Sequence, residues 1–338
     1  MEKNILLICG SINQTRMMHQ ISIYLKRGYK CFFSPYYSDG ILRWLTEKGY
    51  LEFTVLGSKI KEKTLSYLRD FNLRIDDRGE GRKYDLVITC SDLIIPRNIR
   101  KSKTILIQEG MTDPENIFYY LVKYFKFPRY IAGTSTNGLS NAYDAFCVAS
   151  EGYKELFIRK GCNAEKIHVT GIPNFDNCTE YLKNDFPEKD YVLVCTSDAR
   201  ETYRVENRKN FILKALNIAD GKRIIFKLHP NENKERAINE IKKYAPGSVI
   251  FSEGDTNRLI ANCSKLITKY STVVYIGLAL GKEVYSDFDL NHLINLLPIQ
   301  NNGNSASNIA YICRMKINDE KNENYSYITN FLQPINEY

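Results

Sequence analysis

Short apolar runs of strand length alternate with amphipathic stretches of helix length along most of the chain. A strand buried inside a parallel sheet is apolar throughout, whereas apolar positions three and four residues apart mark one face of a helix. In the first half this pattern predicts strands at 5–9, 31–34, 53–56, 85–90, 104–107, 145–149 and 168–170, and helices at 17–26, 65–71 and 153–160. Such alternation is typical of βα units that build a parallel sheet.

The pattern restarts after a polar segment at 177–189, which contains Pro187 and is predicted to be a linker. The second half has predicted strands at 191–195, 223–226, 248–251, 265–268 and 283–286, and helices at 209–219, 235–244, 257–263 and 273–280. We therefore expect an α/β protein with two Rossmann-like, doubly wound parallel sheets that face each other across a cleft. The predicted domains are 1–177 and 190–315. The tail, 316–338, is predicted to contain a helix at 325–332 that packs back on the first domain.

Polar residues follow two predicted strands of the second half. Lys227, His229 and Pro230 come after the strand at 223–226, and Ser271 and Thr272 precede the helix at 273–280. Carboxyl ends of parallel strands line the crevice in which α/β proteins bind ligands. Donor groups, hydroxyls and free backbone N–H groups at such an edge suit a phosphate, so we expect a nucleotide-binding site there.

These motifs, with Val169-Thr170-Gly171-Ile172-Pro173 before them, resemble GT-B fold transferases. The resemblance is to the bacterial group of capsular Kdo transferases, sialyltransferases and CDP-glycerol glycerophosphotransferases, which share an acidic-Gly, a His-Pro and a Ser/Thr motif. The matching segments here are Gln108-Glu109-Gly110, His229-Pro230 and Ser271-Thr272. The resemblance implies a nucleotide-activated donor, with CMP or CDP favoured.

The segment from Ala149 to Asp176 is also similar to the non-hydrolysing UDP-GlcNAc 2-epimerases, which share the fold. The epimerase pattern has a Gly-Gly turn and acidic residues where this chain has Ser271-Thr272-Val273-Val274. An epimerase-like isomerase therefore stays open as an alternative, as does a glycerophosphotransferase.

Glu109 is the predicted general base. It follows the strand at 104–107, and Gly110 lets the backbone turn sharply after it. A transferase needs a base to deprotonate the acceptor hydroxyl. Asp113 is the competing carboxylate, although it can instead cap a helix that begins after Pro114. Gly10, Ser11, Gln108 and Gly110 are predicted to bind the acceptor.

His229 is the second predicted catalytic residue, because an imidazole can stabilise the departing nucleoside phosphate. Pro230 fixes the backbone after it. Thr196, Ser197 and Arg200 follow the strand at 191–195 and are predicted, with Lys227, Ser271 and Thr272, to bind the nucleotide phosphates; Arg204 competes with Arg200 for this role.

Composition narrows the choice of partners and location. The chain has 338 residues and a formal charge of +8, which favours anionic partners. No zinc finger, aromatic RNA-binding motif or basic heptad helix points to nucleic acid. Nine cysteines without a Cys-x-x-Cys pair indicate reduced thiols of a cytoplasmic protein. The chain has no nicotinamide fingerprint, and we expect neither a metal nor a cofactor.

The segment 118–130 is densely aromatic and basic. Such a segment can lie at the inner face of a membrane or receive a lipid-linked glycan. It can equally be a partly buried helix whose lysines extend to solvent.

The sequence thus predicts a cytoplasmic, metal-independent glycosyltransferase. Its donor would be a nucleotide-activated sugar, and its acceptor a polysaccharide of the cell surface, such as capsule or lipopolysaccharide, or a glycolipid. The isomerase and a non-catalytic glycan-binding protein remain as other interpretations.

Overall fold

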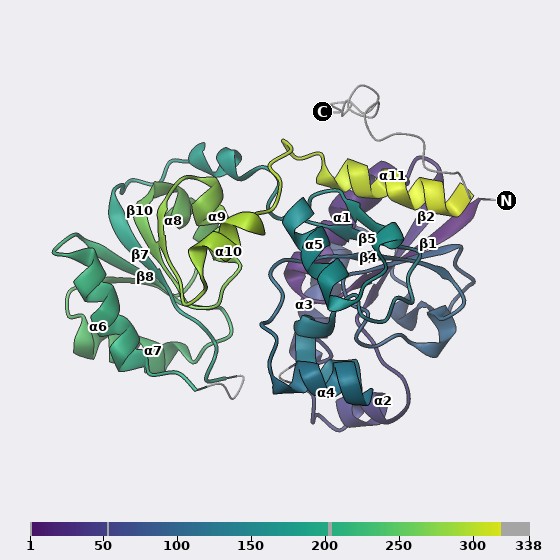
Figure 1. Cartoon of the computed structure of the whole chain (residues 1–338), viewed down its shortest axis with the longest axis horizontal. Coiled ribbons are helices and arrows are strands. Elements are labelled where there is room, and N and C mark those ends of the chain that lie inside the picture. The colour runs from purple at the N-terminus through teal and green to yellow at the C-terminus, as the bar shows by residue number, and fades with distance from the viewer. Residues whose placement is uncertain (1, 53, 202–204, 319–338) are drawn as a thin grey trace. The chain divides into compact units, whose positions relative to one another are not determined.

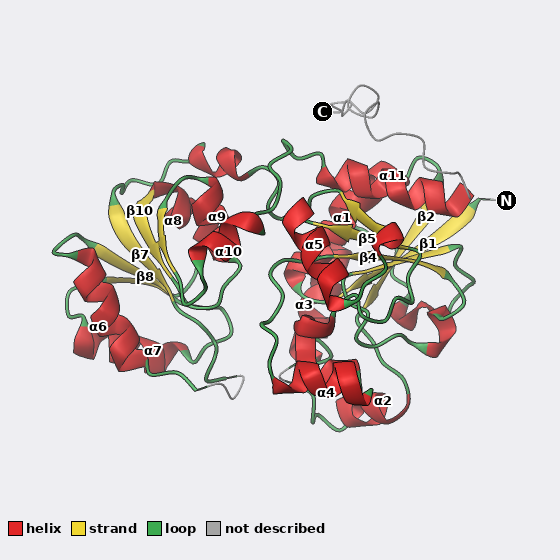
Figure 2. Cartoon of the chain, viewed as in Figure 1, coloured by secondary structure: helices red, strands yellow, loops and turns green. Residues whose placement is uncertain are grey.

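The computed structural model describes residues 2–52, 54–201 and 205–318, which form two compact units (Figure 1). The first unit comprises Met1–Asp176 and the chain from Asn301 onward, and the second comprises Asn177–Gln300. Each unit contains one parallel β-sheet with helices packed against it (Figure 2). The two parallel sheets confirm the two Rossmann-like units that the repeated strand and helix pattern predicted.

The sheet of the first unit has six parallel strands in the order β2-β1-β3-β4-β5-β6. Its strands are β1 (Lys3–Cys9), β2 (Tyr29–Pro35), β3 (Leu86–Thr89), β4 (Lys103–Ile107), β5 (Ala145–Val148) and β6 (Ile167–Val169). The chain passes from β1 to β2 on one side and then returns to the other side of β1 with β3. This reversal makes the carboxyl ends of β1 and β3 a topological switch point, where such sheets bind ligands.

The strand expected at 53–56 is wrong. Thr54, Val55 and Leu56 form turns that lead into a helix, and the Thr54 hydroxyl donates a hydrogen bond to the Leu51 carbonyl. Leu56 is apolar because it packs into the core beside Leu6 and Phe32, not because it pairs with another strand.

The helices of the first unit are α1 (Ile12–Leu25), α2 (Gly40–Glu47), α3 (Ser58–Asp70), α4 (Ile117–Phe125), α5 (Glu151–Lys160) and α11 (Ser305–Asn318). Short 3-10 helices cover Asp77–Gly79, Arg97–Ile99, Arg129–Thr136 and Ala164–Lys166. Helix α1 begins at a Ser11 cap, whose side chain accepts a hydrogen bond from the Gln14 N–H. It packs against α3 and α11.

Helix α11 belongs to the first unit, so the expected second domain of 190–315 extends too far. The helix contacts α1, and Lys3 and Lys103 donate hydrogen bonds to the carbonyls of its last turn. At its beginning, the Ser305 N–H donates to buried Asp176 at 2.8 Å. The helix expected at 325–332 lies outside the described residues.

The sheet of the second unit has five parallel strands in the order β11-β10-β7-β8-β9. They are β7 (Tyr191–Cys195), β8 (Ile224–Lys227), β9 (Val249–Phe251), β10 (Cys263–Ile267) and β11 (Glu283–Tyr285). The chain runs outward from β7 to β9 and then returns to the other side of β7 with β10. The switch point of this sheet therefore lies between the carboxyl ends of β7 and β10.

The helices of the second unit are α6 (Arg208–Ala219), α7 (Lys234–Tyr244), α8 (Thr256–Asn262), α9 (Val273–Ala279) and α10 (Leu290–Asn295), with a 3-10 helix at Cys178–Leu182. Helices α6 and α7 cover one face of the sheet, where Phe211, Ile212 and Ile241 pack on Val194 and Phe226 (Figure 2). This burial of aliphatic and aromatic side chains is the main stabilising term of the unit.

All nine cysteines are free, and eight of them are buried. Among the described residues, no helix is both long and apolar enough to cross a bilayer.

Candidate active site

The carboxyl edge of the first sheet brings Glu109 to the loop that follows β1. The Ser11 hydroxyl donates a hydrogen bond to Glu109 Oε1 at 2.8 Å, and the Gln14 side-chain amide donates to Oε2. Ser11 also caps α1. Both carboxylate oxygens are thus oriented by neutral donors from one helix start, while the Glu109 side chain stays only half-buried.

Gly10 permits this arrangement because it has no side chain. A Cβ atom on Gly10 would lie 1.9 Å from Gln14 Oε1, so a larger residue would displace the amide that holds Glu109. Gly10 and Ser11 were expected to contact an acceptor, and the structure places both beside Glu109.

Gln108 has a different role from the expected contact with an acceptor. Its side chain is 2% exposed, its Nε2 donates to the Gly110 carbonyl and its Oε1 accepts from the Ala149 N–H. With both ends of the amide used, Gln108 joins the loop after β4 to the loop after β5. It positions Glu109, and Gly110 is buried beneath it.

Asp113 hydrogen-bonds to Thr134 and does not cap the following helix, α4. Its carboxylate accepts from the Thr134 hydroxyl at 2.7 Å, and its N–H donates back to that hydroxyl. Asn116 caps α4 instead. Asp113 therefore fastens a loop, and Glu109 is the carboxylate that stays at the strand edge.

The carboxyl edge of the second sheet is built on a buried carboxylate, Glu232. The Thr196 hydroxyl donates to Glu232 Oε1, and the His229 N–H donates to the same oxygen at 2.8 Å. The His229 N–H also lies 3.0 Å from the Thr196 hydroxyl oxygen. The end of β7 and the turn after β8 are thereby fixed to each other. Thr196, predicted to bind phosphate, is 4% exposed and serves this internal role.

Arg208, at the start of α6, neutralises this carboxylate. Its Nη2 lies 3.1 Å from Glu232 Oε2 and its Nε lies 2.7 Å from Glu206 Oε1. The side chains of all three are at most 2% exposed. The Ser197 hydroxyl, another predicted phosphate ligand, donates to Glu206, and its carbonyl accepts from Arg208. Buried charges are tolerated only when they are paired in this way.

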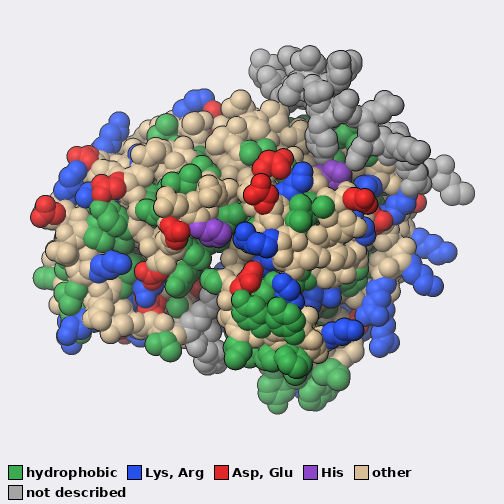
Figure 3. Space-filling model, in the orientation of Figure 1, with side chains coloured by type: hydrophobic (Ala, Val, Ile, Leu, Met, Phe, Trp, Pro, Cys, Tyr) green, Lys and Arg blue, Asp and Glu red, His purple; other side chains and the backbone are tan. Residues whose placement is uncertain are grey.

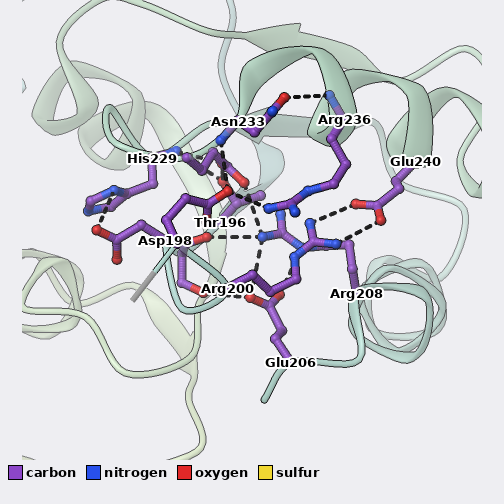
Figure 4. A network of polar contacts seen from close by, with 12 residues as sticks. Thr196, Asp198, Arg200, Glu206, Arg208, His229, Asn233, Arg236 and Glu240 are labelled. Carbon is purple, nitrogen blue, oxygen red and sulfur yellow. Dashed lines mark hydrogen bonds and ion pairs between the residues drawn. The ribbon is translucent and has the colours of Figure 1, made fainter. Parts of the chain in front are cut away.

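The His229 imidazole lies on the accessible side of this network, opposite Asp198 (Figure 4). Its Nδ1 is 3.5 Å from Asp198 Oδ2 and 3.3 Å from the Asn231 N–H nitrogen. Because Nδ1 accepts from the Asn231 N–H, Nε2 is left to carry a hydrogen that can be donated to a ligand oxygen.

The structure does not present Arg200 and Lys227 as free cations. Arg200 forms a bidentate ion pair with Glu240, with both N–O distances at 2.8 Å. This pairing occupies the nitrogens that a phosphate would need, so the expected role of Arg200 is not supported. The Lys227 amine is buried and donates to the Leu228 carbonyl, and burial lowers its pKa. Arg204 lies outside the described residues.

Ser271 and Thr272 follow β10, the strand beside β7, and precede α9. Both are partly exposed. The Ser271 hydroxyl oxygen lies 3.5 Å from the Val273 nitrogen, and the Thr272 side chain makes no capping hydrogen bond. Exposed Pro230 follows His229 after β8, which is separated from β10 by β7. The accessible polar groups of this edge include His229, Asp198, Asn231, Ser271 and Thr272.

Several residues of the two edges have no role in the sequence-based interpretation. Glu232 follows His229 by three residues, and this spacing in a Pro-containing turn is the local signal that could have revealed it. Asp198 lies in the loop after β7, between the predicted ligands Ser197 and Arg200. Gln14, Glu206 and Arg208 give no signal in the local sequence, because they hydrogen-bond to residues elsewhere in the chain: Glu109, Ser197 and Glu232. Among the described residues, no three His, Cys, Asp or Glu side chains group as metal ligands do.

Comparison with known proteins supports the fold and leaves the reaction open. No family model and no curated protein sequence matches the chain. Solved structures do: a variant of the wall teichoic acid polymerase TagF has 12% identity and a TM-score of 0.53, over 94% of this chain and 90% of that one. The UDP-GlcNAc 2-epimerase of Neisseria meningitidis, bound to UDP-GlcNAc, has 14% identity and a TM-score of 0.56, over 92% and 99%. Staphylococcus aureus MnaA with UDP has 12% identity and a TM-score of 0.56, over 94% and 97%.

Proposed function

We propose that the protein is a glycosyltransferase that moves a sugar from a nucleotide-activated donor to a cell-surface polysaccharide or a glycolipid. The observation that carries this proposal is the fixed His229 turn at the carboxyl edge of the second sheet. With Nδ1 accepting from the Asn231 N–H, Nε2–H can stabilise the negative charge on a departing nucleoside phosphate. The partly exposed Ser271 and Thr272 supply further hydrogen-bond donors at the end of β10, on the same edge.

Glu109 supplies the complementary function on the first unit. A carboxylate held by Ser11 and Gln14 is oriented without being neutralised by a cation. It can therefore accept the proton of an acceptor hydroxyl as that hydroxyl attacks the donor. The loop after β1, with Gly10 and Ser11, would contact the acceptor.

The donor class is supported by the structural similarities and by the sequence motifs. Solved structures of this fold are described with UDP-GlcNAc and with UDP. The His-Pro and Ser/Thr motifs resemble those of transferases that use CMP- or CDP-linked donors. We therefore favour a cytidine nucleotide, with a uridine nucleotide as the competing choice.

Two alternatives keep the same nucleotide site. An epimerase-like isomerase would eliminate and re-add UDP without an acceptor, and a glycerophosphotransferase would use CDP-glycerol. Both alternatives stay open because the fold is similar to that of TagF and to that of the 2-epimerases. Incubation with UDP-GlcNAc alone separates the first: an isomerase forms the epimer, and a transferase does not.

Thermal denaturation with CMP, CDP, UDP, GDP and ADP tests the proposal. A ligand at a hundred times its Kd stabilises the folded protein by about 2.7 kcal/mol, which gives a measurable shift of Tm. We expect a selective shift with one pyrimidine nucleotide, present in His292→Ala, an exposed histidine of the same unit, and reduced in His229→Ala. Absence of any nucleotide response would contradict the proposal.

A further inference from the structure

Helix α4 is apolar on two faces, and the described part of the chain covers only one of them. Tyr119 and Val122 are buried against Ala132 and Leu139. The opposite face is exposed: Ile117 is 70% exposed, Tyr124 67% and Phe125 70%. A helix of a water-soluble unit normally carries polar residues on its outer face, so this second apolar face needs a partner.

The exposed apolar residues continue beyond the helix and form what we name the aromatic ridge. Its members are Ile117, Phe118, Tyr120, Tyr124, Phe125, Phe127, Tyr130 and Ile131. Ile41 and Trp44 of α2 are also exposed. Figure 3 shows hydrophobic side chains gathered at the end of the first unit where Figure 1 places α4 and α2. Large contiguous apolar patches of this kind mark interaction surfaces.

The charge of the ridge is mainly positive. Residues 117–131 contain Lys123, Lys126 and Arg129 and no Asp or Glu, and Glu115 lies just before them, near Lys123. Lys123 and Lys126 are exposed; Lys123 also donates to the Tyr119 hydroxyl. Arg129 donates to the Asp92 carbonyl. The partner is therefore expected to be both apolar and anionic.

We propose that the aromatic ridge docks the first unit on an anionic lipid bilayer. Tyr and Phe side chains are favoured at the boundary between headgroups and acyl chains, and Lys side chains beside them contact anionic headgroups. Each Lys or Arg near an anionic surface strengthens the attraction to it. A second copy of this chain is a poorer partner, because it would place the same cations opposite one another in a protein of charge +8.

Co-sedimentation with lipid vesicles tests this surface, with vesicles of pure phosphatidylcholine and of phosphatidylcholine with about one third phosphatidylglycerol. We expect binding to the anionic vesicles that weakens strongly between about 0.05 M and about 0.5 M salt. The double variant Tyr124→Ser/Phe125→Ser should lower the partition coefficient at least about tenfold. Lys123→Gln/Lys126→Gln should lower binding to anionic vesicles and remove most of its salt dependence.

Matched controls come from the second unit. Leu182 and Leu213 are 53% and 45% exposed, so Leu182→Ser/Leu213→Ser removes comparable apolar surface elsewhere. Lys183→Gln/Lys214→Gln removes two exposed lysines in the same way. Both control variants should bind vesicles as the unaltered protein does, and circular dichroism should show all variants to be folded.

Equal binding by ridge and control variants would overturn the proposal, as would an absence of binding to anionic vesicles. A dimer in solution that the ridge variants dissociate would also overturn it, because the occupant would then be a second copy. Vesicle binding needs no donor, so its result is independent of the nucleotide response that tests the proposed function.

Discussion

The two carboxyl edges hold their key acidic residues in opposite ways. On the first sheet, Glu109 is half-buried and is held by the neutral donors Ser11 and Gln14. On the second sheet, Glu232 is buried, accepts from Thr196 and the His229 N–H, and is neutralised by Arg208. The first carboxylate keeps an accessible negative charge, whereas the second uses its charge to fix a turn.

This difference indicates which group can react and which supports another. Glu232 is buried in an ion pair with Arg208 and hydrogen-bonds to the His229 turn, so it cannot reach a substrate. Glu109 is half-buried and is held only by hydroxyl and amide donors, so a ligand can reach it. The contrast supports the proposal that Glu109 takes part in proton transfer and that Glu232 positions His229.

Replacement of Glu109 by Gln is expected to have the largest effect on activity. The amide cannot accept a proton, so transfer activity should fall by about 100- to 10,000-fold, while nucleotide binding and Tm stay near those of the unaltered protein. Single-turnover assays with donor and acceptor measure the effect. The neighbouring exposed residue gives the control, since Glu115→Gln should remain active. Full activity of a folded Glu109→Gln variant would remove Glu109 from the mechanism.

Replacement of Glu232 by Gln breaks the second arrangement. The change leaves the buried Arg208 with Glu206 alone, and removing one partner of a buried ion pair costs about 3 kcal/mol of the free energy of unfolding. Urea denaturation followed by circular dichroism measures this loss. The exposed Glu235 is a matched site, and Glu235→Gln should change stability by less than about 0.5 kcal/mol. Equal stability of the two variants would show that the network does not fix the His229 turn.

A buried histidine of the first unit, His168, makes the stability of the protein depend on pH. His168 in β6 is buried, and burial, followed by the charges of Lys316 and Lys154, lowers its pKa to about 4. The unfolded chain binds this proton near pH 6.5, whereas the folded protein does not. Stability from His168 is thus present above about pH 6.5 and is lost as the pH falls toward 4.

Between pH 7 and pH 4.5 this one group should lower the free energy of unfolding by about 2 kcal/mol. Denaturation of the unaltered protein and of His168→Gln at both pH values isolates the contribution, because the variant lacks the titrating ring. An identical loss of stability in both proteins would place the acid sensitivity elsewhere.

Local pattern predicted the strands well, because a strand buried on both faces must be apolar throughout. The runs that became β7 and β8 show this, and the restart of the pattern after 177–189 indicated two sheets. The strand expected at 53–56 failed because Leu56 has the same apolar character in a turn that reaches the core. The position of α11 depends on contacts with α1, which are almost the full chain length away in sequence.

The positions of the candidate residues at strand ends could be predicted from the sequence, but the residues they contact could not. Placing Glu109 and His229 at strand ends needs only the order of strands and loops. Arg200 looked available for phosphate because its partner Glu240 is 40 residues further along the chain. In the same way Thr196 and Ser197 looked like ligands, and their hydroxyls are used by Glu232 and Glu206. Such pairings follow from packing, which local sequence does not encode.

The proposal that His229 binds the nucleotide and Glu109 does not is tested most directly by calorimetry. The ligand is the nucleotide that gives the largest thermal shift. We would compare the unaltered protein, His229→Ala and Glu109→Gln. The account predicts that His229→Ala raises the Kd at least about tenfold, since charge stabilisation of this kind is worth several kcal/mol, and that Glu109→Gln leaves it unchanged. Weakened binding in Glu109→Gln with unchanged binding in His229→Ala would contradict it.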